Sequence, residues 1–375
     1  MRVVALRSPI VDVTSRISEA LGRHGCTAHG FTTADPFAEM GPRLEDAVAS
    51  GRSGGLPFTF REPRTSSDPK ASFPWARSIV VAAMPYLPGA GMPGTARPGT
   101  ARIARFATRD HYEPLRHALH EVAQVLFDSG FRAEVLVDDS RLVDRAAAVR
   151  AGVGWSGRST LVLVPGAGPW VLLGSVITDA DLEPSAEMRR GCGTCTACIP
   201  ACPTGAIIAP GVLDARRCLS AILQSPGWIP AEIRTAVGDR LYGCDDCLDA
   251  CPPGDRLLAL ATNPVGRVDV YALLGSDDAA LRASVPHFYV PRNEGRWLRR
   301  NALVVLGNTG GPGSVGVLAG YSGHRDPMLR GHAAWSLGQV GDARAKAVLR
   351  RIAGSDPDEQ VAAEATAALD GTLPG

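Results

Sequence analysis

Eight of the nine cysteines lie in one short stretch of the chain, and their spacing is that of an iron–sulfur protein. They occur in the order Cys192-x2-Cys195-x2-Cys198-x3-Cys202-Pro203, then Cys218, then Cys244-x2-Cys247-x3-Cys251-Pro252. Three thiolates at two-residue gaps, followed by a fourth before a proline, are typical of a loop that wraps a cubane [4Fe-4S] cluster. The series therefore predicts one-electron chemistry.

The order of the cysteines also predicts which of them share a cluster. In two-cluster ferredoxins, the cysteine before the proline binds the cluster of the other loop. The first cluster is then held by Cys192, Cys195, Cys198 and Cys251. The second is held by Cys244, Cys247 and Cys202, and Cys218 completes it as the one cysteine left in the region. Eight ligands account for two [4Fe-4S] clusters.

Other uses of these cysteines fit the pattern less well. Zinc sites are usually built from separate CxxC pairs. A disulfide framework is typical of small secreted domains, whereas this chain has 375 residues. Cys26 stands apart near the N-terminus, and we interpret it as a small buried hydrophobic residue rather than a reactive thiol.

Composition limits the class of protein. The chain is 45% hydrophobic, enough for two or three domains, and it contains no apolar run long enough to cross a membrane. The N-terminal residues lack the pattern of a signal peptide, so we expect a cytoplasmic protein. A net charge of +1 argues against a chain that coats nucleic acid along its length. Positive charge is nevertheless concentrated in one arginine cluster, which comprises Arg292, Arg296, Arg299 and Arg300.

The first half of the chain reads as mixed α and β. Buried strands are predicted at Ser78–Tyr86 and Ala133–Asp138, and an amphipathic helix at Leu115–Gly130. Thr160–Val164 and Trp170–Thr178 read as two strands paired around a turn. The Pro/Gly-rich stretch Leu87–Arg102 predicts a surface loop.

The second half combines the cysteine module with a repeat. Short helices are predicted within Val212–Leu223 and Pro230–Leu241. Leu298–Gly311 recurs as Leu329–Asp342, and a weaker third copy ends at Ala363–Leu369, which indicates HEAT-type helical stacking. An ordinary helical cap is the alternative. We therefore predict three domains, at 1–181, 182–258 and 259–375.

Electrons from such clusters need an acceptor. The sequence resembles a family of enzymes in which a second cofactor accepts them. The sequence is similar to the epoxyqueuosine reductase family, as a divergent member. The resemblance rests on the cysteine order and on Val137–Asp179 (VDDSRLVDRAAAVRAGVGWSGRSTLVLVPGAGPWVLLGSVITD), Tyr242–Cys247 (YGCDDC) and Arg299–Asn308 (RRNALVVLGN). A nicotinamide-binding Rossmann motif is not found, because Gly152–Gly157 follows a helical run rather than a strand.

The resemblance implies an α+β fold with a nitroreductase-like cobalamin-binding α/β region, a ferredoxin-like module with two [4Fe-4S] clusters, and C-terminal HEAT-like helical repeats. It implies that the clusters reduce a bound cobalamin to the cob(I) state, which removes the epoxide oxygen of epoxyqueuosine in tRNA. Implied partners are a tRNA anticodon stem-loop, gripped by the repeats, and an external low-potential electron donor. We expect a monomer.

Removal of the epoxide oxygen also needs a proton, and the carboxyls after the strand Ala133–Asp138 are candidates for its donor. The family's acid aligns with Asp138, and Asp139 is expected to face away and pair with Arg141. A helix cap or turn is the alternative role of Asp138. The resemblance further implies cobalamin contacts, at Arg158, Ser159, Thr160, Ser220, Asp245 and Asp246.

Several segments depart from the family's pattern. Arg105–Tyr112 (RFATRDHY) inverts a Tyr-His pair, Pro253-Gly254 replaces Trp-Asn after the second Cys-Pro, and the region before Arg64 matches poorly. Two alternatives therefore remain. One is a corrinoid-dependent reductase of another small molecule, and the other is a ferredoxin-type electron-transfer protein.

Overall fold

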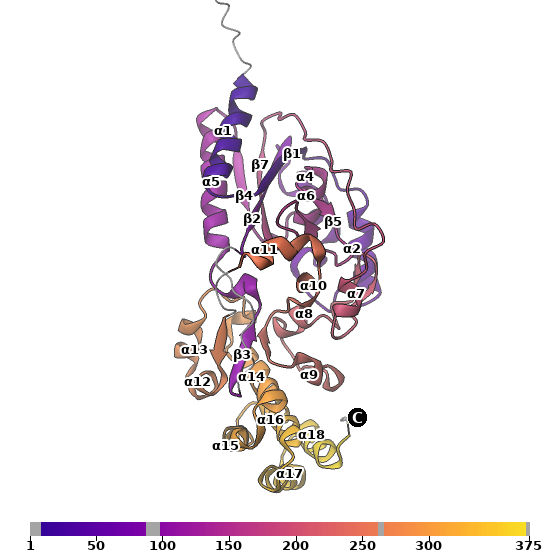
Figure 1. Cartoon of the computed structure of the whole chain (residues 1–375), viewed down its shortest axis with the longest axis vertical. Helices are drawn as coiled ribbons and strands as arrows, with labels where there is room; N and C mark the ends of the chain where they lie inside the picture. The colour runs from indigo at the N-terminus through magenta and orange to yellow at the C-terminus, as the bar shows by residue number, and fades with distance from the viewer. Residues whose placement is uncertain (1–8, 88–97, 262–265, 373–375) are drawn as a thin grey trace, which may run out of the picture. The chain divides into compact units, whose positions relative to one another are not determined.

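The chain folds into two compact units, each built from several segments of the sequence (Figure 1). The structure is a computed structural model that describes residues 9–87, 98–261 and 266–372. The first unit takes its described residues from Met1–Gly89, Asp110–Arg216 and Asp246–Thr262. The second takes them from Ala90–Arg109, Arg217–Asp245 and Asn263–Gly375. The boundaries of the three predicted domains stay a prediction.

A four-stranded sheet forms the centre of the first unit. Its strands, in spatial order, are β1 (Ala28–Thr33), β2 (Ser78–Pro85), β7 (Val171–Thr178) and β4 (Ala133–Leu136). Each neighbouring pair is antiparallel. Seven of the eight residues of β2 are buried, which explains why the strand is a continuous apolar run rather than an alternating one. An antiparallel sheet packed with helices confirms the predicted α+β class.

Helices cover both faces of this sheet. They are α1 (Pro9–Arg23), α2 (Met40–Ala49), α3 (Pro63–Ser67), α4 (Pro69–Ser72), α5 (Tyr112–Asp128) and α6 (Asp144–Arg150), with a 3-10 turn at Phe58–Phe60. Figure 1 shows α1 and α5 side by side. Gly174 faces α5 so closely that a Cβ atom would lie 2.5 Å from Leu119. Val81 and Ala83, on the opposite face, pack in one core with Ala147 and Ala148 of α6.

The predicted hairpin between Thr160–Val164 and Trp170–Thr178 is wrong. β6 (Val162–Leu163) pairs with β5 (Trp155–Ser156), while β7 pairs with β2 and β4. The turn expected between them closes only as a single bridge, from Val164 to Gly168. β7 therefore takes its partners from distant segments, because they bury its apolar residues on both sides. The strands at β2 and β4 and the helix α5 are confirmed, with ends that differ by a few residues.

The remaining elements of the first unit lie in or next to the cysteine-rich part of the chain. They are α7 (Cys198–Ala201), β8 (Ile207–Ala209), β9 (Val212–Leu213), α10 (Asp246–Asp249), a 3-10 turn at Pro252–Gly254 and α11 (Asp255–Ala259). The helices α7 and α10 contact each other. Val212–Leu213 is thus a strand, so only the later part of the helix predicted within Val212–Leu223 forms.

The second unit begins with a three-stranded sheet. Its order is β10 (Arg240–Tyr242), β3 (Thr100–Ile103) and β11 (Arg267–Asp269). The segment Thr100–Arg102, predicted as loop, is therefore strand, because pairing on both sides outweighs its Pro/Gly-rich surroundings. Residues 88–97 of that predicted loop lie outside the described residues. Short helices follow, at Arg105–Ala107, α8 (Leu219–Leu223), α9 (Ala231–Val237), α12 (Val270–Gly275), α13 (Asp278–Ser284) and Pro291–Asn293.

Stacked helices complete the second unit and confirm the predicted repeat. They are α14 (Arg296–Thr309), a 3-10 turn at Gly311–Ser314, α15 (Val315–Tyr321), α16 (Pro327–Val340), α17 (Ala343–Ser355) and α18 (Glu359–Asp370). Helix α16 packs against both α14 and α18. Asp326, Asp342 and Asp358 begin α16, α17 and α18, and each carboxylate accepts a hydrogen bond from a backbone N–H of the first turn.

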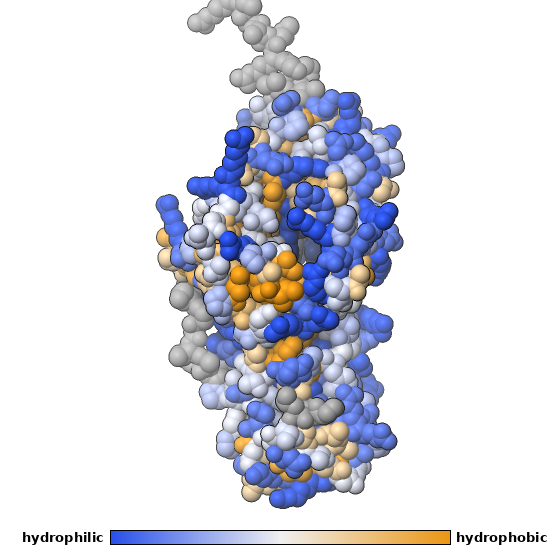
Figure 2. All heavy atoms as spheres, turned by 90° about the vertical axis from the view of Figure 1, so that its right-hand side faces the viewer, coloured by the Kyte–Doolittle hydropathy of each residue, from blue (hydrophilic) through white to orange (hydrophobic). Residues whose placement is uncertain are grey.

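The surface is mainly polar. Figure 2 shows one face of the molecule, which is largely hydrophilic, with hydrophobic side chains gathered in a patch near the middle of the view. Among the described residues, none of the helices is long and apolar enough to span a membrane.

Candidate redox site

Four of the predicted cluster ligands come together in the first unit. The pKa of the Cys251 thiol is raised to about 12, first by burial and then by the neighbouring charges of Cys192, Cys198 and Cys195. Cys192 also packs against the small core that contains Cys251. The four thiols are those that the spacing assigned to the first cluster. Bound iron would supply the positive charge that four clustered thiolates need.

An unpaired indole supports the fit of a cluster here. Trp155 lies in the same core as Cys251, and its Nε1–H is buried without a partner among the described residues. A buried N–H without an acceptor is costly, and cluster sulfurs are acceptors of the kind it lacks. No three cysteine, histidine or carboxylate groups of the described chain converge tightly enough for a single metal ion. A cubane cluster does not require such close convergence, because each of its thiolates binds a different iron atom and the thiolates are separated by the width of the cluster.

Cys202 and Cys247 lie on the two helices of the first unit that contact each other. Cys202 ends α7, and Cys247 lies in α10. Burial alone would raise the pKa of Cys202, but backbone N–H groups of Thr204 and Ala206 outweigh it and lower the pKa. The Ala206 N–H donates to the Cys202 Sγ at 3.1 Å. Such donors favour a thiolate, as a ligand requires.

The second unit holds Cys218 and Cys244 on neighbouring elements. Cys218 caps the N-terminus of α8, and Cys244 follows β10, which contacts α8. Asp245 is buried, and its Oδ2 accepts hydrogen bonds from the backbone N–H of Arg105 at 2.8 Å and from its Nη1 at 3.3 Å. The Ser220 hydroxyl accepts a hydrogen bond from Gln224.

Asp138 lies in a strained turn two residues after β4. Its φ of 52° is in the left-handed region, which costs energy for a residue other than glycine and is common at functional sites. The residue is exposed at the surface, but desolvation by the protein atoms around its carboxyl, aided by the charges of Asp144 and Asp139, raises the pKa of Asp138, while Arg145 opposes the shift. The carboxyl therefore keeps its proton at a higher pH than an ordinary aspartate does, as a general acid must.

Asp139 takes a different role from its neighbour, as expected from the sequence. Arg141 donates from Nη2 to Asp139 Oδ2 at 2.6 Å and from Nε to Oδ1 at 3.0 Å. The hydrogen bond from Arg141 holds the pKa of Asp139 below its usual value. The pairing of Asp139 with Arg141 is thus confirmed, although the segment is turned at Asp138 rather than extended.

Arg145 links Asp138 to the predicted cobalamin segment. Its guanidinium acts on the Asp138 carboxyl, and its Nη1 donates to the Thr160 carbonyl at 3.2 Å. Thr160 has a φ of 72° and so shares the left-handed strain of Asp138. The local sequence does not indicate a role for Arg145, because that role depends on the Thr160 segment, which approaches Arg145 only in the folded chain.

The Arg158 side chain contacts the loop between Cys192 and Cys195. Its Nη2 donates to the carbonyl oxygen of Gly193, between Cys192 and Cys195, at 2.7 Å. Ser159 beside it is buried. The turn thus joins the loop of the first cluster to the surroundings of Asp138, within the same unit.

The residues present fit a corrinoid in their chemistry. Asp138 and Thr160 both have a left-handed backbone, and Arg145 donates to the Thr160 carbonyl while its charge acts on the Asp138 carboxyl. Cobalamin carries amide side chains and a phosphodiester, which bind to hydroxyls, backbone N–H groups and arginine. Asp138, Ser159 and Thr160 offer such groups. Asp246, in the first turn of α10, lies one residue from Cys247.

The departure at Pro253-Gly254 has a steric reason. A Cβ atom on Gly254 would lie 2.6 Å from Nε1 of Trp170, and one on Gly168 would lie 2.5 Å from the backbone N of Gly254. Trp170 itself is fully buried. The Gly254 position therefore accepts only glycine in this chain, since the loop Gly168–Trp170 fills the space of a side chain.

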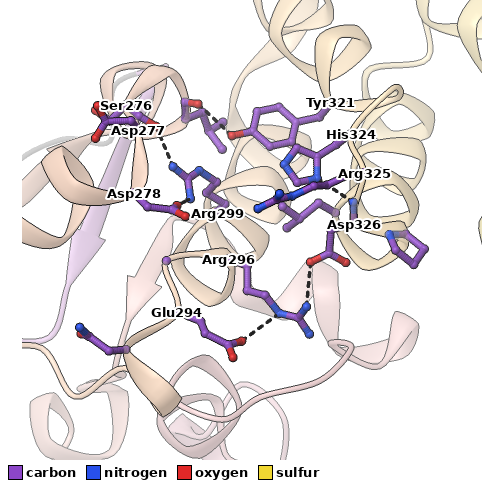
Figure 3. Close-up of a pocket in the computed structure, with 15 residues that line it drawn as sticks. Ser276, Asp277, Asp278, Glu294, Arg296, Arg299, Tyr321, His324, Arg325 and Asp326 are labelled. Atoms are coloured by element: carbon purple, nitrogen blue, oxygen red, sulfur yellow. Dashed lines mark hydrogen bonds and ion pairs between the residues drawn. The ribbon is translucent and has the colours of Figure 1, made fainter.

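The arginine cluster is largely used within the protein. Two of its members, Arg296 and Arg299, line a pocket of about 900 Å³ in the second unit, shown in Figure 3. Arg296 is held between Glu294 and Asp326, at 3.3 and 3.1 Å. Arg299 pairs with Asp278, and Arg300 is buried. Carboxylates thus neutralise much of the positive charge that the sequence displays here.

Family models match three parts of the chain. Residues 67–139 match the model described as epoxyqueuosine reductase QueG, DUF1730. Residues 191–254 match the 4Fe-4S double cluster binding domain, and residues 292–370 match HEAT repeats. The second and third matches cover the cysteine module and the stacked helices predicted from the sequence.

Known proteins match nearly the whole chain. An epoxyqueuosine reductase of Bacillus subtilis (strain 168) is 31% identical over 97% of this chain and 95% of its own length. One of Xanthomonas campestris pv. campestris is 32% identical over 91% of this chain and its full length. Among solved structures, a selenomethionine-labelled epoxyqueuosine reductase has a TM-score of 0.87 at 29% identity, and covers 96% of this chain and 99% of its own. Another, solved with an epoxyqueuosine-modified tRNA-Tyr stem loop, has a TM-score of 0.85 at 29% identity with the same coverage.

Proposed function

The chain belongs to the epoxyqueuosine reductase family, and on this premise we propose that it reduces epoxyqueuosine in tRNA to queuosine. The observation that carries the proposal is Asp138, whose strained turn and raised pKa suit a general acid, in a chain whose relatives match it from end to end. A plain ferredoxin would need neither this carboxyl nor the helical repeats.

The chain holds two [4Fe-4S] clusters, as its double cluster binding domain indicates. We assign Cys192, Cys195, Cys198 and Cys251 to the first cluster. For the second we assign Cys202, Cys218, Cys244 and Cys247. The mutual influence of the first four thiols supports the first assignment, and cysteine spacing supports the second.

Cobalamin is the acceptor of the electrons in this proposal. When bound, it supplies the strongly reducing, nucleophilic cobalt that opening an epoxide requires. Ser159 and the Thr160 turn are suited to its amide and phosphodiester groups, and Arg158 would bridge its surroundings to the first cluster's loop. Ser220, Asp245 and Asp246 complete the proposed contacts.

Asp138 supplies the proton of the reaction. Conversion of the epoxide to the alkene consumes two electrons and two protons, and the oxygen leaves as water. Desolvation raises the pKa of Asp138, so its carboxyl holds a proton more readily than an ordinary aspartate and can donate it to the departing oxygen. The positive charge of Arg145 then stabilises the carboxylate that remains until it is protonated again.

The substrate in this proposal is the anticodon stem-loop of a tRNA. A relative of similar structure was solved with a modified tRNA stem loop. We further propose that the protein acts as a monomer in the cytoplasm and takes its electrons from an external low-potential donor.

The test is reduction of a defined substrate. The protein would be reconstituted anaerobically with iron, sulfide and cobalamin, reduced chemically, and mixed with tRNA from a strain that accumulates epoxyqueuosine. Nucleoside mass spectrometry should show a loss of one oxygen atom from the modified base, with no conversion when cobalamin is omitted. If the fully loaded, reduced protein leaves the tRNA unchanged, the tRNA assignment fails and reduction of another small molecule becomes the better hypothesis.

The ligand assignment has its own test. Replacement of Cys218 or Cys251 by alanine should lower the iron content from about eight to about four atoms per chain, because each change removes a ligand of one cluster. Cys26→Ala is the matched control. Burial raises the pKa of Cys26 to about 11, as in an unreactive thiol, so this variant should keep both clusters.

A further inference from the structure

Two adjacent polar residues of the first repeat helix are buried as deeply as its leucines. Arg300 is 1% exposed and Asn301 is 0% exposed, in the middle of the α14 surface that packs on the rest of the second unit. Burial of an arginine and an amide is costly unless each polar group finds a partner. Their partners therefore indicate what the burial achieves.

Asn301 joins the two segments that carry cysteines of the second unit. Its Nδ2 donates to the carbonyl oxygen of Leu223 at 2.8 Å and to that of Leu241 at 2.9 Å. Leu223 ends α8, the helix that Cys218 caps. Leu241 lies in β10, three residues before Cys244. One side-chain amide thus fixes the end of the Cys218 helix against the strand that leads to Cys244.

Arg300 fixes both the amide and the chain that follows α8. Its Nη2 donates to the Ile222 carbonyl at 3.0 Å, and its Nη1 donates to the Ser225 carbonyl at 2.9 Å. Nη2 and Nε also donate to Asn301 Oδ1, at 2.8 and 3.0 Å. These bonds turn the oxygen of Asn301 toward the guanidinium and leave its N–H groups for the two carbonyls.

From these contacts we infer that Arg300 and Asn301 are positioning residues for the second iron–sulfur cluster. They set the distance between Cys218 and Cys244 before the cluster forms, and hold it when the cluster changes oxidation state. The repeat region therefore has a function in cluster assembly, in addition to any contact with RNA. The inference rests on the proposed assignment of Cys218 and Cys244 as ligands of one cluster.

The same helix provides a matched control. Asn308 lies two turns further along α14, and its Nδ2 also donates to two carbonyl oxygens, of Arg234 at 2.9 Å and Gly238 at 3.2 Å. These belong to α9 and the turn after it, rather than to a segment next to a cysteine. Asn308→Ala therefore removes a similar pair of hydrogen bonds without releasing either ligand segment.

The experiment compares the cluster content of Asn301→Ala and Asn308→Ala in the full chain. After anaerobic reconstitution, iron and acid-labile sulfide are counted, and the reduced protein is examined by electron paramagnetic resonance. We expect about four iron atoms per chain in Asn301→Ala, with the signal of one cluster, and about eight in Asn308→Ala. Circular dichroism and Tm verify that both variants are folded.

A conservative change decides the matter if Asn301→Ala does not fold. Arg300→Lys keeps the positive charge but not the forked donor geometry. It should retain about eight iron atoms, yet release the second cluster's iron to a chelator faster, on the order of tenfold, because hydrogen bonds that hold the ligand segment are lost. An unchanged release rate overturns the inference.

Other outcomes are equally decisive. A folded Asn301→Ala that holds about eight iron atoms and the signals of both clusters overturns the positioning role. Equal loss of iron in Asn301→Ala and Asn308→Ala, with equal loss of Tm, also overturns it in favour of general destabilisation. If Cys218→Ala and Cys244→Ala keep both clusters, the ligand assignment itself is wrong. The tRNA assay reports the proposed reaction separately.

Discussion

Arg234 and Glu364 form a two-bonded ion pair that connects α9 to the last helix of the repeats. Nη1 of Arg234 lies 2.7 Å from Oε2 of Glu364 and Nη2 lies 2.6 Å from Oε1, and both side chains are 2% exposed. A buried pair contributes little net stability as a pair, but the loss of one partner leaves a buried charge without compensation. The pair therefore makes the packing of α18 depend on α9.

Replacement of one partner should be costly. Glu364→Ala is expected to lower the free energy of unfolding by about 3–5 kcal/mol, measured by urea denaturation. The double change Arg234→Met with Glu364→Leu should recover most of that loss, because apolar residues of similar size fill the site without a charge. A double variant as unstable as Glu364→Ala would contradict this account.

His332 predicts a dependence of stability on pH. The ring is fully buried, accepts a hydrogen bond at Nε2 from the Ile229 N–H at 3.2 Å, and donates from Nδ1 to the Met328 carbonyl at 2.7 Å. Burial holds its pKa well below the ordinary value of 6.5. Below about pH 6.5, the unfolded chain therefore binds a proton that the folded chain cannot bind.

Stability should consequently fall as the pH is lowered below the unfolded pKa. The contribution of His332 is at most about 1.4 kcal/mol per pH unit, and it is absent above pH 7. Urea unfolding of the wild type between pH 5 and 8 should show this slope, and His332→Gln should show less of it. His120→Gln, which changes an exposed histidine, should keep the wild-type slope.

Trp155 predicts a change of cluster potential. Its unpaired indole N–H lies in the core that contains Cys251, and hydrogen bonds to cluster sulfurs stabilise the more negative, reduced state. Trp155→Phe should lower the reduction potential of the first cluster by an amount on the order of tens of millivolts. Potentiometric titration followed by electron paramagnetic resonance measures this potential. Trp75→Phe, in a different core of the same unit, should leave the potential unchanged.

The features that the sequence predicts well are those carried by short spacing. The cysteine series, the apolar run of β2 and the recurrence from Leu298 to Leu329 each lie within one local pattern. The predictions that are wrong concern strands whose partners lie far away in the sequence. The pattern of β7 predicts a strand but does not specify which strand it joins, and the Pro/Gly-rich composition around Thr100–Arg102 predicts a loop where pairing with β10 and β11 forms a strand.

The side chains that the sequence did not reveal share this cause. Arg145 and Asn301 lie in segments that carry the family resemblance, but they act on backbone carbonyls of distant segments, so the local sequence does not show their roles. The arginine cluster shows the reverse error. Its charge is evident in the sequence, but its carboxylate partners Asp278 and Asp326 come from other helices and become apparent only in the fold.

Asp138 allows the sharpest test of the chemistry. Desolvation raises the pKa of its carboxyl, and a general acid must be protonated to act, so the rate of reduction should fall as the pH rises through that raised pKa. This fall in rate should occur at a pH above the ordinary aspartate pKa of about 4. Single-turnover reduction of the modified tRNA measures it with the clusters already reduced, so that the electron supply does not limit the rate.

Two variants identify the group responsible. Asp138→Asn cannot donate the proton and should lower the rate by about 10²–10⁴-fold, while iron content and cobalamin spectrum stay unchanged. Arg145→Gln removes the charge that opposes the raised pKa of Asp138, so it should move the fall in rate to higher pH. Asp139→Asn removes a charge that raises the pKa of Asp138, so it should move the fall in rate to lower pH. A wild-type pH profile in Asp138→Asn would exclude Asp138 as the acid and return it to the role of a turn residue.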